Sequence, residues 1–220
     1  MKVVIFGATG MIGQGVLREC LLDPDVERVV AVVRRSTGNP HPKLHEVIRS
    51  DVSNLSAAEG ALAGLDACFF CLGVTSLGMS ELEYTKVTHD LTLLVARTLM
   101  RTSPALTFVY VSGAGSDSTE RGRVMWARVR GRLENALLAM PFRDVYIFRP
   151  AAIIPLDGIR SATGWYNTLY AVIRPLFPVI KRLSPGLISN TRQMGRAMLG
   201  VSRRGFPKHV LEMKDINSVE

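Results

Sequence analysis

The sequence predicts an α/β protein built on a doubly wound parallel sheet. Short apolar runs alternate with helical patterns along the first 150 residues. Because each apolar run is nearly continuous, we expect the strands to be covered by helices on both faces. The chain has 220 residues, of which 47% are apolar and 21% charged, so it is large and apolar enough to fold as one domain.

The alternation of patterns places each element along the chain. Strands are predicted at residues 2–6, 29–33, 45–49, 67–72, 106–111 and 145–149, and helices at 13–22, 54–63, 81–102 and 123–139. The expected strand order is 3-2-1-4-5-6, with a ligand crevice at the carboxyl ends of the strands. Residues 1–155 form the main unit. Residues 156–220 leave the βα pattern and add a helix near 190–205 and a tail that forms a short strand or stays loose.

The first strand runs into a glycine-rich turn, GATGMIG at residues 7–13, and a helix follows. Gly7 permits the sharp turn, Gly10 lets the backbone approach a phosphate, and Gly13 lets the helix pack closely on the sheet. The helix amides and dipole would face the anion. A glycine motif alone is only a flexible turn, but this order of strand, loop and helix predicts a dinucleotide site. Its predicted residues are Gly7, Thr9, Gly10, Met11, Ile12 and Gly13.

The second strand ends in two arginines, Arg34 and Arg35, where NAD-binding proteins of this design carry an acidic residue for the ribose hydroxyls. Guanidinium groups suit a 2′-phosphate through their charge and paired N–H donors. The alternative is a solvated basic turn. We therefore expect NADP(H) in preference to NAD(H).

The remaining strand ends add further candidates for the cofactor. After the third strand, Asp51 is either an acceptor for the adenine amino group or a turn carboxylate. Gly73 would let the chain pass close to the ribose and pyrophosphate, and main-chain groups with Ile153 would line the nicotinamide. The predicted cofactor residues in these segments are Asp51, Val52, Leu72, Gly73, Val74, Pro150 and Ile153.

Three cysteines, Cys20, Cys68 and Cys71, are too few for a disulfide framework, and residues 68–71 match C-x-x-C inside a predicted strand. Strand geometry sends the two sulfurs to opposite faces, so we expect core residues and no metal site. The apolar N-terminal run is the first strand rather than a secretory signal, which led us to expect a cytoplasmic protein.

The excess of positive charge lies in the second half of the chain. Residues 1–110 contain 10 Lys/Arg and 11 Asp/Glu, whereas residues 111–220 contain 17 and 8. A basic half fits an anionic substrate, a membrane surface, nucleic acid or an acidic partner. The densest basic segment, 121–132, has one aromatic residue and no nucleic-acid module, so we do not expect nucleic-acid binding.

Residues 165–183 contain an apolar run that ends at Ile180 and is followed by Lys181-Arg182. Pro175 and Pro178 interrupt it, and it is too short to span a bilayer. It is interpreted as a lid over the substrate; the alternatives are peripheral contact with a membrane surface and an interface in a homo-oligomer.

These motifs resemble the short-chain dehydrogenase/reductase superfamily, which has the Rossmann fold. The likeness is closest to atypical members, the Tat-interacting oxidoreductase group and small bacterial NAD-dependent epimerase/dehydratase homologues. It covers roughly residues 1–155 and implies that the C-terminal region is a small, mostly helical substrate lobe. The motifs are GATGMIG, the Asp-Val after the third strand, FFCLG at 69–73, VSGAGSD at 111–117, FRPAAIIP at 148–155, VTHD at 87–90 and RGRLE at 130–134.

The resemblance implies a Tyr-x-x-x-Lys pair on the helix after the fifth strand, with both side chains on one face. In the family, the tyrosine transfers a proton and the lysine binds the ribose. The matching positions are Trp126 and Arg130. The indole donates a hydrogen bond but does not cycle a proton, while Arg130 keeps a charge for the ribose. Ser112 matches the hydroxyl at the strand end, with Ser116 as the alternative.

Three functions follow from these residues. The first is an NADP(H)-dependent reductase of a small carbonyl, quinone or similar substrate, with a proton from water or another residue. The second is a non-catalytic, NADPH-sensing regulatory protein. The third is a nucleoside-sugar epimerase or dehydratase, which loss of the Tyr/Lys pair would impair most.

Overall fold

A parallel seven-stranded sheet forms the centre of the computed structural model, which describes residues 1–159, 186 and 188–219. The strand order is β3-β2-β1-β4-β5-β6-β9, and all neighbours run parallel. The predicted sheet and its 3-2-1-4-5-6 order are confirmed, and the tail adds β9 beside β6. The strands are β1 (Lys2–Phe6), β2 (Arg28–Val33), β3 (Leu44–Ile48), β4 (Ala67–Phe70), β5 (Thr107–Val111), β6 (Asp144–Arg149) and β9 (Val210–Glu212).

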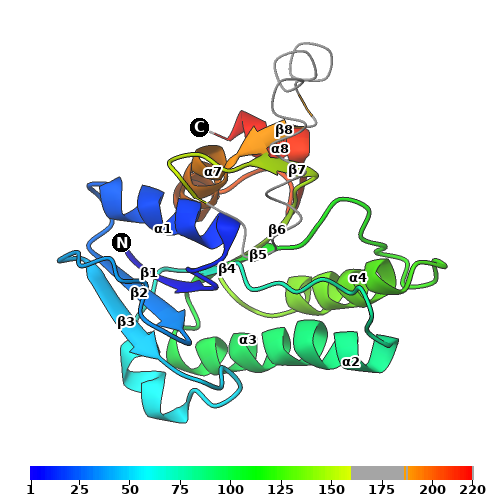
Figure 1. Ribbon diagram of the computed structural model, residues 1–220, viewed down its shortest axis with the longest axis horizontal. Helices are drawn as coiled ribbons and strands as arrows, with labels where there is room; N and C mark the ends of the chain where they lie inside the picture. The colour runs from blue at the N-terminus through cyan, green and yellow to red at the C-terminus, as the bar shows by residue number, and fades with distance from the viewer. Residues whose placement is uncertain (160–185, 187, 220) are drawn as a thin grey trace.

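Helices cover both faces of this sheet (Figure 1). Side chains of each strand alternate between two apolar clusters: Val3 and Ile5 belong to one, Val4 and Phe6 to the other. The first cluster is closed by α1 (Met11–Leu22), α7 (Thr191–Arg204) and α8 (Met213–Ser218). The second is closed by the 3-10 helix η1 (Ser56–Leu62), α3 (Leu91–Thr102) and α4 (Met125–Leu138). This is the doubly wound arrangement that the continuous apolar strands predict.

Helical segments differ from the predictions in two places. The helix predicted at 54–63 is the 3-10 helix η1 over Ser56–Leu62 rather than an α-helix; the segment is short and has Gly60 inside it, which weakens an α-helix. The predicted helix at 81–102 is helical throughout, but a π-helical turn, η2 (Lys86–Asp90), separates α2 (Glu81–Thr85) from α3. Its hydrogen bonds shift there by one residue.

The C-terminal part contributes directly to these layers. The predicted helix near 190–205 is α7, which buries Met194, Ala197 and Met198 in the same cluster as β1. A second small parallel sheet pairs β7 (Ala152–Ile154) with β8 (Ile188–Asn190). The apolar run at 165–183 lies outside the described residues.

Helices α1 and α7 approach closely because glycine occurs on both. A Cβ at Gly15 would lie 2.6 Å from both Cβ and the carbonyl oxygen of Thr191. A Cβ at Gly195 would lie 2.8 Å from Cγ of Glu19. Contact at this range leaves no room for a methyl group. The two glycines therefore hold α7 against the helix that carries the glycine-rich turn.

Replacing Gly15 by alanine tests this packing. A Gly→Ala change inside a helix ordinarily stabilises it by up to about 1 kcal/mol. Here we expect the free energy of unfolding to fall by about 1–3 kcal/mol, because the backbone of α7 must move. Denaturant unfolding measures the change. Gly60→Ala is the control, since a Cβ there meets nothing within 4 Å. A Gly15→Ala protein as stable as the wild type would contradict the close contact.

Candidate dinucleotide site

The glycine-rich turn brings β1, β4 and α1 together at the carboxyl edge of the sheet. Gly7 has a φ of +83°, and a Cβ there would lie 2.8 Å from the carbonyl carbon of Cys71. A Cβ at Gly13 would collide with the carbonyl oxygen of Gly7. A Cβ at Gly10 would meet only that same oxygen, at 3.3 Å. Gly7 and Gly13 are thus required by the protein's own backbone, whereas the surface over Gly10 is open to a ligand.

Helix α1 begins at Met11 without a side-chain cap. Gly10 is its N-cap residue, and no acidic side chain lies in the first turn. Met11 and Ile12 pack their side chains against the core, while Thr9 is exposed and its carbonyl oxygen accepts from Nε2 of Gln14 at 2.9 Å. Uncapped amides and the positive end of the helix dipole suit an anion. The cradle therefore fits a pyrophosphate.

Two exposed arginines follow β2. Arg34 and Arg35 form no ion pair with any residue in the described ranges. The next residues are tied down: Ser36 Oγ donates to Glu46 Oε2 at 2.6 Å, and the backbone N–H of Thr37 donates to Glu46 Oε1 at 2.7 Å. These hydrogen bonds, that of Ser36 first, lower the pKa of Glu46, so its carboxylate is ionised at neutral pH. Glu46 thus anchors the turn that carries the arginines.

A cavity of about 640 Å³ lies beside this turn. Thr9, Gln14, Ser36 and Thr37 are among its lining residues, and it continues along α1 past Leu17. The cavity extends from the glycine-rich turn to the segment after β2, where a ribose 2′-phosphate would lie. Neither Arg34 nor Arg35 lines it; Ser36, the residue after them, does.

The segments after β3 and β4 differ in how open they are. Asp51 is exposed, and its Oδ1 accepts from the backbone N–H of Ser53 at 2.8 Å, which makes it a turn carboxylate; hydrogen bonds from Ser53 lower its pKa. Val52 and Leu72 pack against the core. A Cβ on Gly73 would meet nothing within 4 Å, and Val74 is exposed beside it. The chain therefore leaves room at Gly73, as the sequence predicts.

Beyond β6, two predicted residues have structural contacts. The carbonyl oxygen of Pro150 accepts from the N–H of Ala114 at 3.0 Å and ties together the segments after β5 and β6. Ile153 lies in β7 and is 4% exposed within the apolar core. Its side chain therefore packs inward, and only the neighbouring main chain is available to line the crevice.

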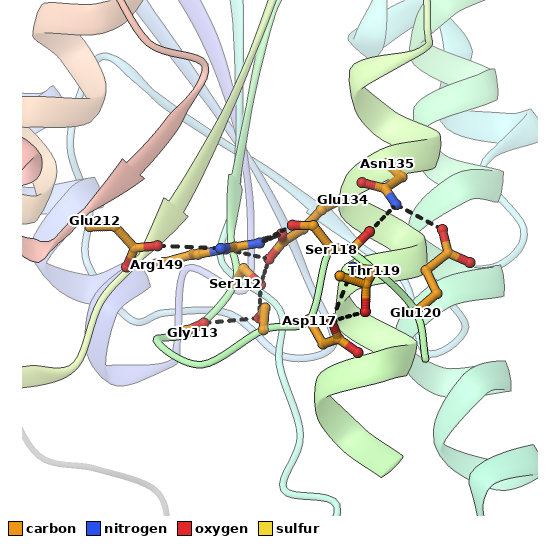
Figure 2. Close-up of polar contacts among 11 residues, drawn as sticks. Ser112, Gly113, Asp117, Ser118, Thr119, Glu120, Glu134, Asn135, Arg149 and Glu212 are labelled. Atoms are coloured by element: carbon orange, nitrogen blue, oxygen red, sulfur yellow. Dashed lines mark hydrogen bonds and ion pairs between the residues drawn. The ribbon is translucent and has the colours of Figure 1, made fainter. Parts of the chain in front are cut away.

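A buried ionic network fills the space between β5, β6 and α4 (Figure 2). Glu134 on α4 is 1% exposed and pairs with Arg149 at the end of β6. Arg149 also donates to Ser118 Oγ at 2.6 Å and to Glu212 at 3.3 Å, so it joins β6, β9 and the segment after β5. A buried carboxylate needs such partners, because removing one leaves an uncompensated charge.

Ser112 belongs to this network. It is 6% exposed, its Oγ donates to Oε1 of Glu134, and the Oγ of Ser116 lies 3.0 Å away. Ser116 in turn donates to the carbonyl oxygen of Gly113 at 2.9 Å. A hydroxyl has one hydrogen to donate. The hydrogens of both serines are therefore engaged within the protein.

Trp126 and Arg130 lie together on α4, as their spacing predicts. The guanidinium carbon of Arg130 is 5.6 Å from the centre of the Trp126 ring. Nε of Arg130 donates to the hydroxyl of Tyr84 at 2.9 Å, and a Cβ on Gly113 would collide with Nη1. The positive charge at the lysine position therefore lies over the end of β5.

Several residues of this site carry only weak signals in the sequence. Glu134 is four residues after Arg130 on one helix, a spacing that places both on one face. Tyr84 and Arg149 reach the site only through the packing of α2 and β6, and Glu46 through the pairing of β3 with β2. No local pattern marks these contacts.

The cysteines behave as core residues. Cys68 lies in one apolar cluster and Cys71 packs against the other, as strand geometry predicts. Burial raises the pKa of Cys71 to about 12. Within the described ranges, no group of three or more His, Cys, Asp or Glu side chains is placed to hold a metal ion. No helix in those ranges has the length and apolar character to cross a membrane.

Comparison with known proteins places this geometry in a family. Residues 7–141 match a family model described as NAD(P)H-binding. The chain is 28% identical over 159 residues to "Protein fmp52, mitochondrial" of Emericella nidulans, covering 69% of this chain and 66% of that protein. It thus spans about two thirds of the length of such curated relatives.

Solved structures share the fold at low sequence identity. A short chain dehydrogenase family protein from Francisella tularensis has a TM-score of 0.66 and 11% identity, covering 100% of this chain and 99% of that one. UDP-glucose 4-epimerase from Thermotoga maritima has a TM-score of 0.67 and 14% identity, covering 96% and 76%. The predicted resemblance to the short-chain dehydrogenase/reductase superfamily is confirmed for the fold.

The comparisons also correct one expectation. The cytoplasmic location predicted from the sequence is wrong, since the matched fungal relatives are named as mitochondrial proteins. The N-terminal strand and sparse cysteines describe the folded domain and carry no signal for a compartment of this kind.

The family model covers more than half of the chain, and the residues it matches include the open glycine cradle and the strand ends around it. The chain therefore belongs to the NAD(P)H-binding family, with the Rossmann fold of short-chain dehydrogenases and reductases.

Proposed function

We propose that this chain binds NADP(H) in preference to NAD(H) and reduces a small carbonyl, quinone or similar substrate. The observation that carries the cofactor preference is the pair of exposed arginines after β2. Arg34 and Arg35 have no carboxylate partner among the described residues. A dianionic phosphate would supply the missing charge through paired N–H···O bonds.

The surroundings of the arginines support the same preference. NAD-selective sites place a carboxylate where the ribose hydroxyls lie. The carboxylate bonded to the residues that follow the arginines, Glu46, already accepts hydrogen bonds from Ser36 and from both the N–H and Oγ1 of Thr37. Three of the acceptor positions of this carboxylate are therefore used within the turn itself.

The nicotinamide, when bound, supplies a hydride to the substrate. The chain would contribute binding and orientation. Arg130 would hold the ribose at the nicotinamide end by charge-assisted hydrogen bonds. Trp126 offers an indole N–H, which donates a hydrogen bond but does not release its proton near neutral pH. We assign the proton to water, because Ser112 and Ser116 donate their hydrogens inside the protein.

A second candidate function is a non-catalytic protein that senses NADPH. The observation that favours it is the loss of proton-transfer groups: Trp126 and Arg130 stand at the Tyr and Lys positions, and the Ser112 hydroxyl donates to Glu134. Purified protein with NADPH and a panel of aldehydes, ketones, quinones and FMN separates the two functions. Steady oxidation of NADPH with any of them supports the reductase; binding without oxidation across the panel supports the sensor.

Removing the arginine pair tests the cofactor preference. We expect the wild type to bind NADPH more tightly than NADH in isothermal titration. In Arg34→Ala/Arg35→Ala the NADPH affinity should fall about 10- to 100-fold, because charged hydrogen bonds contribute about 1.5–3 kcal/mol each before partial solvent screening. NADH affinity should change little. Arg97→Ala, an exposed arginine on α3, is the control. Equal wild-type affinities for the two cofactors would refute the preference.

Ser112→Ala tests whether this serine acts on the substrate or supports Glu134. We expect the free energy of unfolding to fall by about 1–3 kcal/mol, because a buried carboxylate loses a donor. NADPH affinity and any turnover should persist. Ser118→Ala, which removes only an acceptor of Arg149, should cost less stability. Loss of turnover in a Ser112→Ala protein of unchanged stability would instead give Ser112 a catalytic role.

A further inference from the structure

Arg130 is a partly buried cation without an anionic partner. Among the residues that the structure describes, no carboxylate lies within ion-pair distance of its guanidinium. Its single hydrogen bond to these residues is the one from Nε to the Tyr84 hydroxyl, at 2.9 Å. A cation in such a place is costly unless something else uses its charge. The N–H groups of Nη1 and Nη2 thus remain for a ligand.

Three neighbouring residues restrict where those N–H groups point, and Tyr110 also lies close enough to interact electrostatically with Arg130. The guanidinium carbon lies over the Trp126 ring, Gly113 makes room for Nη1, and the Tyr84 hydroxyl accepts from Nε. Trp126 and Gly113 restrict the guanidinium plane of Arg130 through non-bonded contact alone. The hydrogen bond from Nε is directional, so it sets the rotation of the group within that space.

Tyr84 is itself held firmly. It is 1% exposed, and α2 begins with a capping box in which Ser80 and Glu83 bond each other's backbone. Arg128 of α4 also donates to Glu81 of α2 at 2.6 Å. The phenol is therefore buried at a fixed place beside α4.

We infer that Tyr84 is a positioning residue, which orients the Arg130 guanidinium toward the ribose at the nicotinamide end of the cofactor. This inference rests on the proposed function. As in the family's Tyr/Lys pair, a tyrosine and a cation act together. Here, however, the tyrosine comes from α2 and orients the cation instead of transferring a proton. An alternative is that Tyr84 only fills the core between α2 and α4.

The test compares two ligands that differ at the nicotinamide end. NADPH carries the nicotinamide ribose, whereas 2′,5′-ADP ends at the adenosine half. For Tyr84→Phe we expect NADPH affinity to fall about 3- to 10-fold in isothermal titration, from loss of a hydrogen bond that orients a charged group. The affinity for 2′,5′-ADP should not change, because that ligand does not reach Arg130.

Two further variants separate positioning from structure. In an Arg130→Lys background, which has no Nε–H in that place, adding Tyr84→Phe should not weaken NADPH further. Tyr146→Phe is the matched control: this tyrosine is 2% exposed, and its hydroxyl accepts from the N–H of Phe206 at 3.1 Å, on the other side of the sheet. It should lower the melting temperature and leave both affinities unchanged.

The outcomes distinguish this inference from the proposed function. Equal weakening of both ligands by Tyr84→Phe, no weakening of either, or an effect that persists in Arg130→Lys would overturn the positioning role alone. A wild type that binds neither NADPH nor 2′,5′-ADP would overturn the proposed function and this inference with it. Loss of NADPH affinity alone, absent in Arg130→Lys, supports it.

Discussion

The close approach of Gly13 to the carbonyl oxygen of Gly7 sets the position of α1. A Cβ at residue 13 would collide with that oxygen, so only glycine allows the approach. With that contact, α1 starts directly at the carboxyl edge of the sheet and presents uncapped amides there. The same helix packs against α7 through Gly15 and Gly195, so residues near the C-terminal end of the chain stabilise the element that forms the anion cradle. Binding geometry and fold stability thus depend on one close-packed helix.

The far end of the crevice is organised differently from its family counterparts. Trp126 and Arg130 stand where the family resemblance implies Tyr and Lys, a buried Glu134–Arg149 pair lies beside them, and Arg130 donates to Tyr84. Ser112 donates to Glu134 and Gly113 makes room for Arg130. Adjacent residues at the end of β5 therefore lie beside two cationic groups: Arg149, which is paired with Glu134, and Arg130, which has no ion pair among the described residues.

Much of the fold follows from local patterns. Continuous apolar strands and short glycine-marked turns predict the parallel sheet, and strand order places Gly7, Arg34 and Gly73 at one edge. The site is less readable, because Tyr84 reaches Arg130 across 46 positions of sequence and Glu46 reaches Ser36 through strand pairing. Ile153 illustrates the opposite error: its position after β6 suggests the crevice, but β7 turns its side chain into the core.

The sequence by itself determined the fold class, the glycine cradle and the basic residues after β2, since periodicity and glycine spacing act over a few residues. Only the tertiary structure decided that Ser112 serves Glu134, that Tyr84 holds Arg130, and that β9 and α7 complete the layers. The physical reason is that a hydrogen bond between distant elements depends on the orientation of both side chains after packing. The sequence of one strand or helix does not by itself specify which distant side chain it will contact.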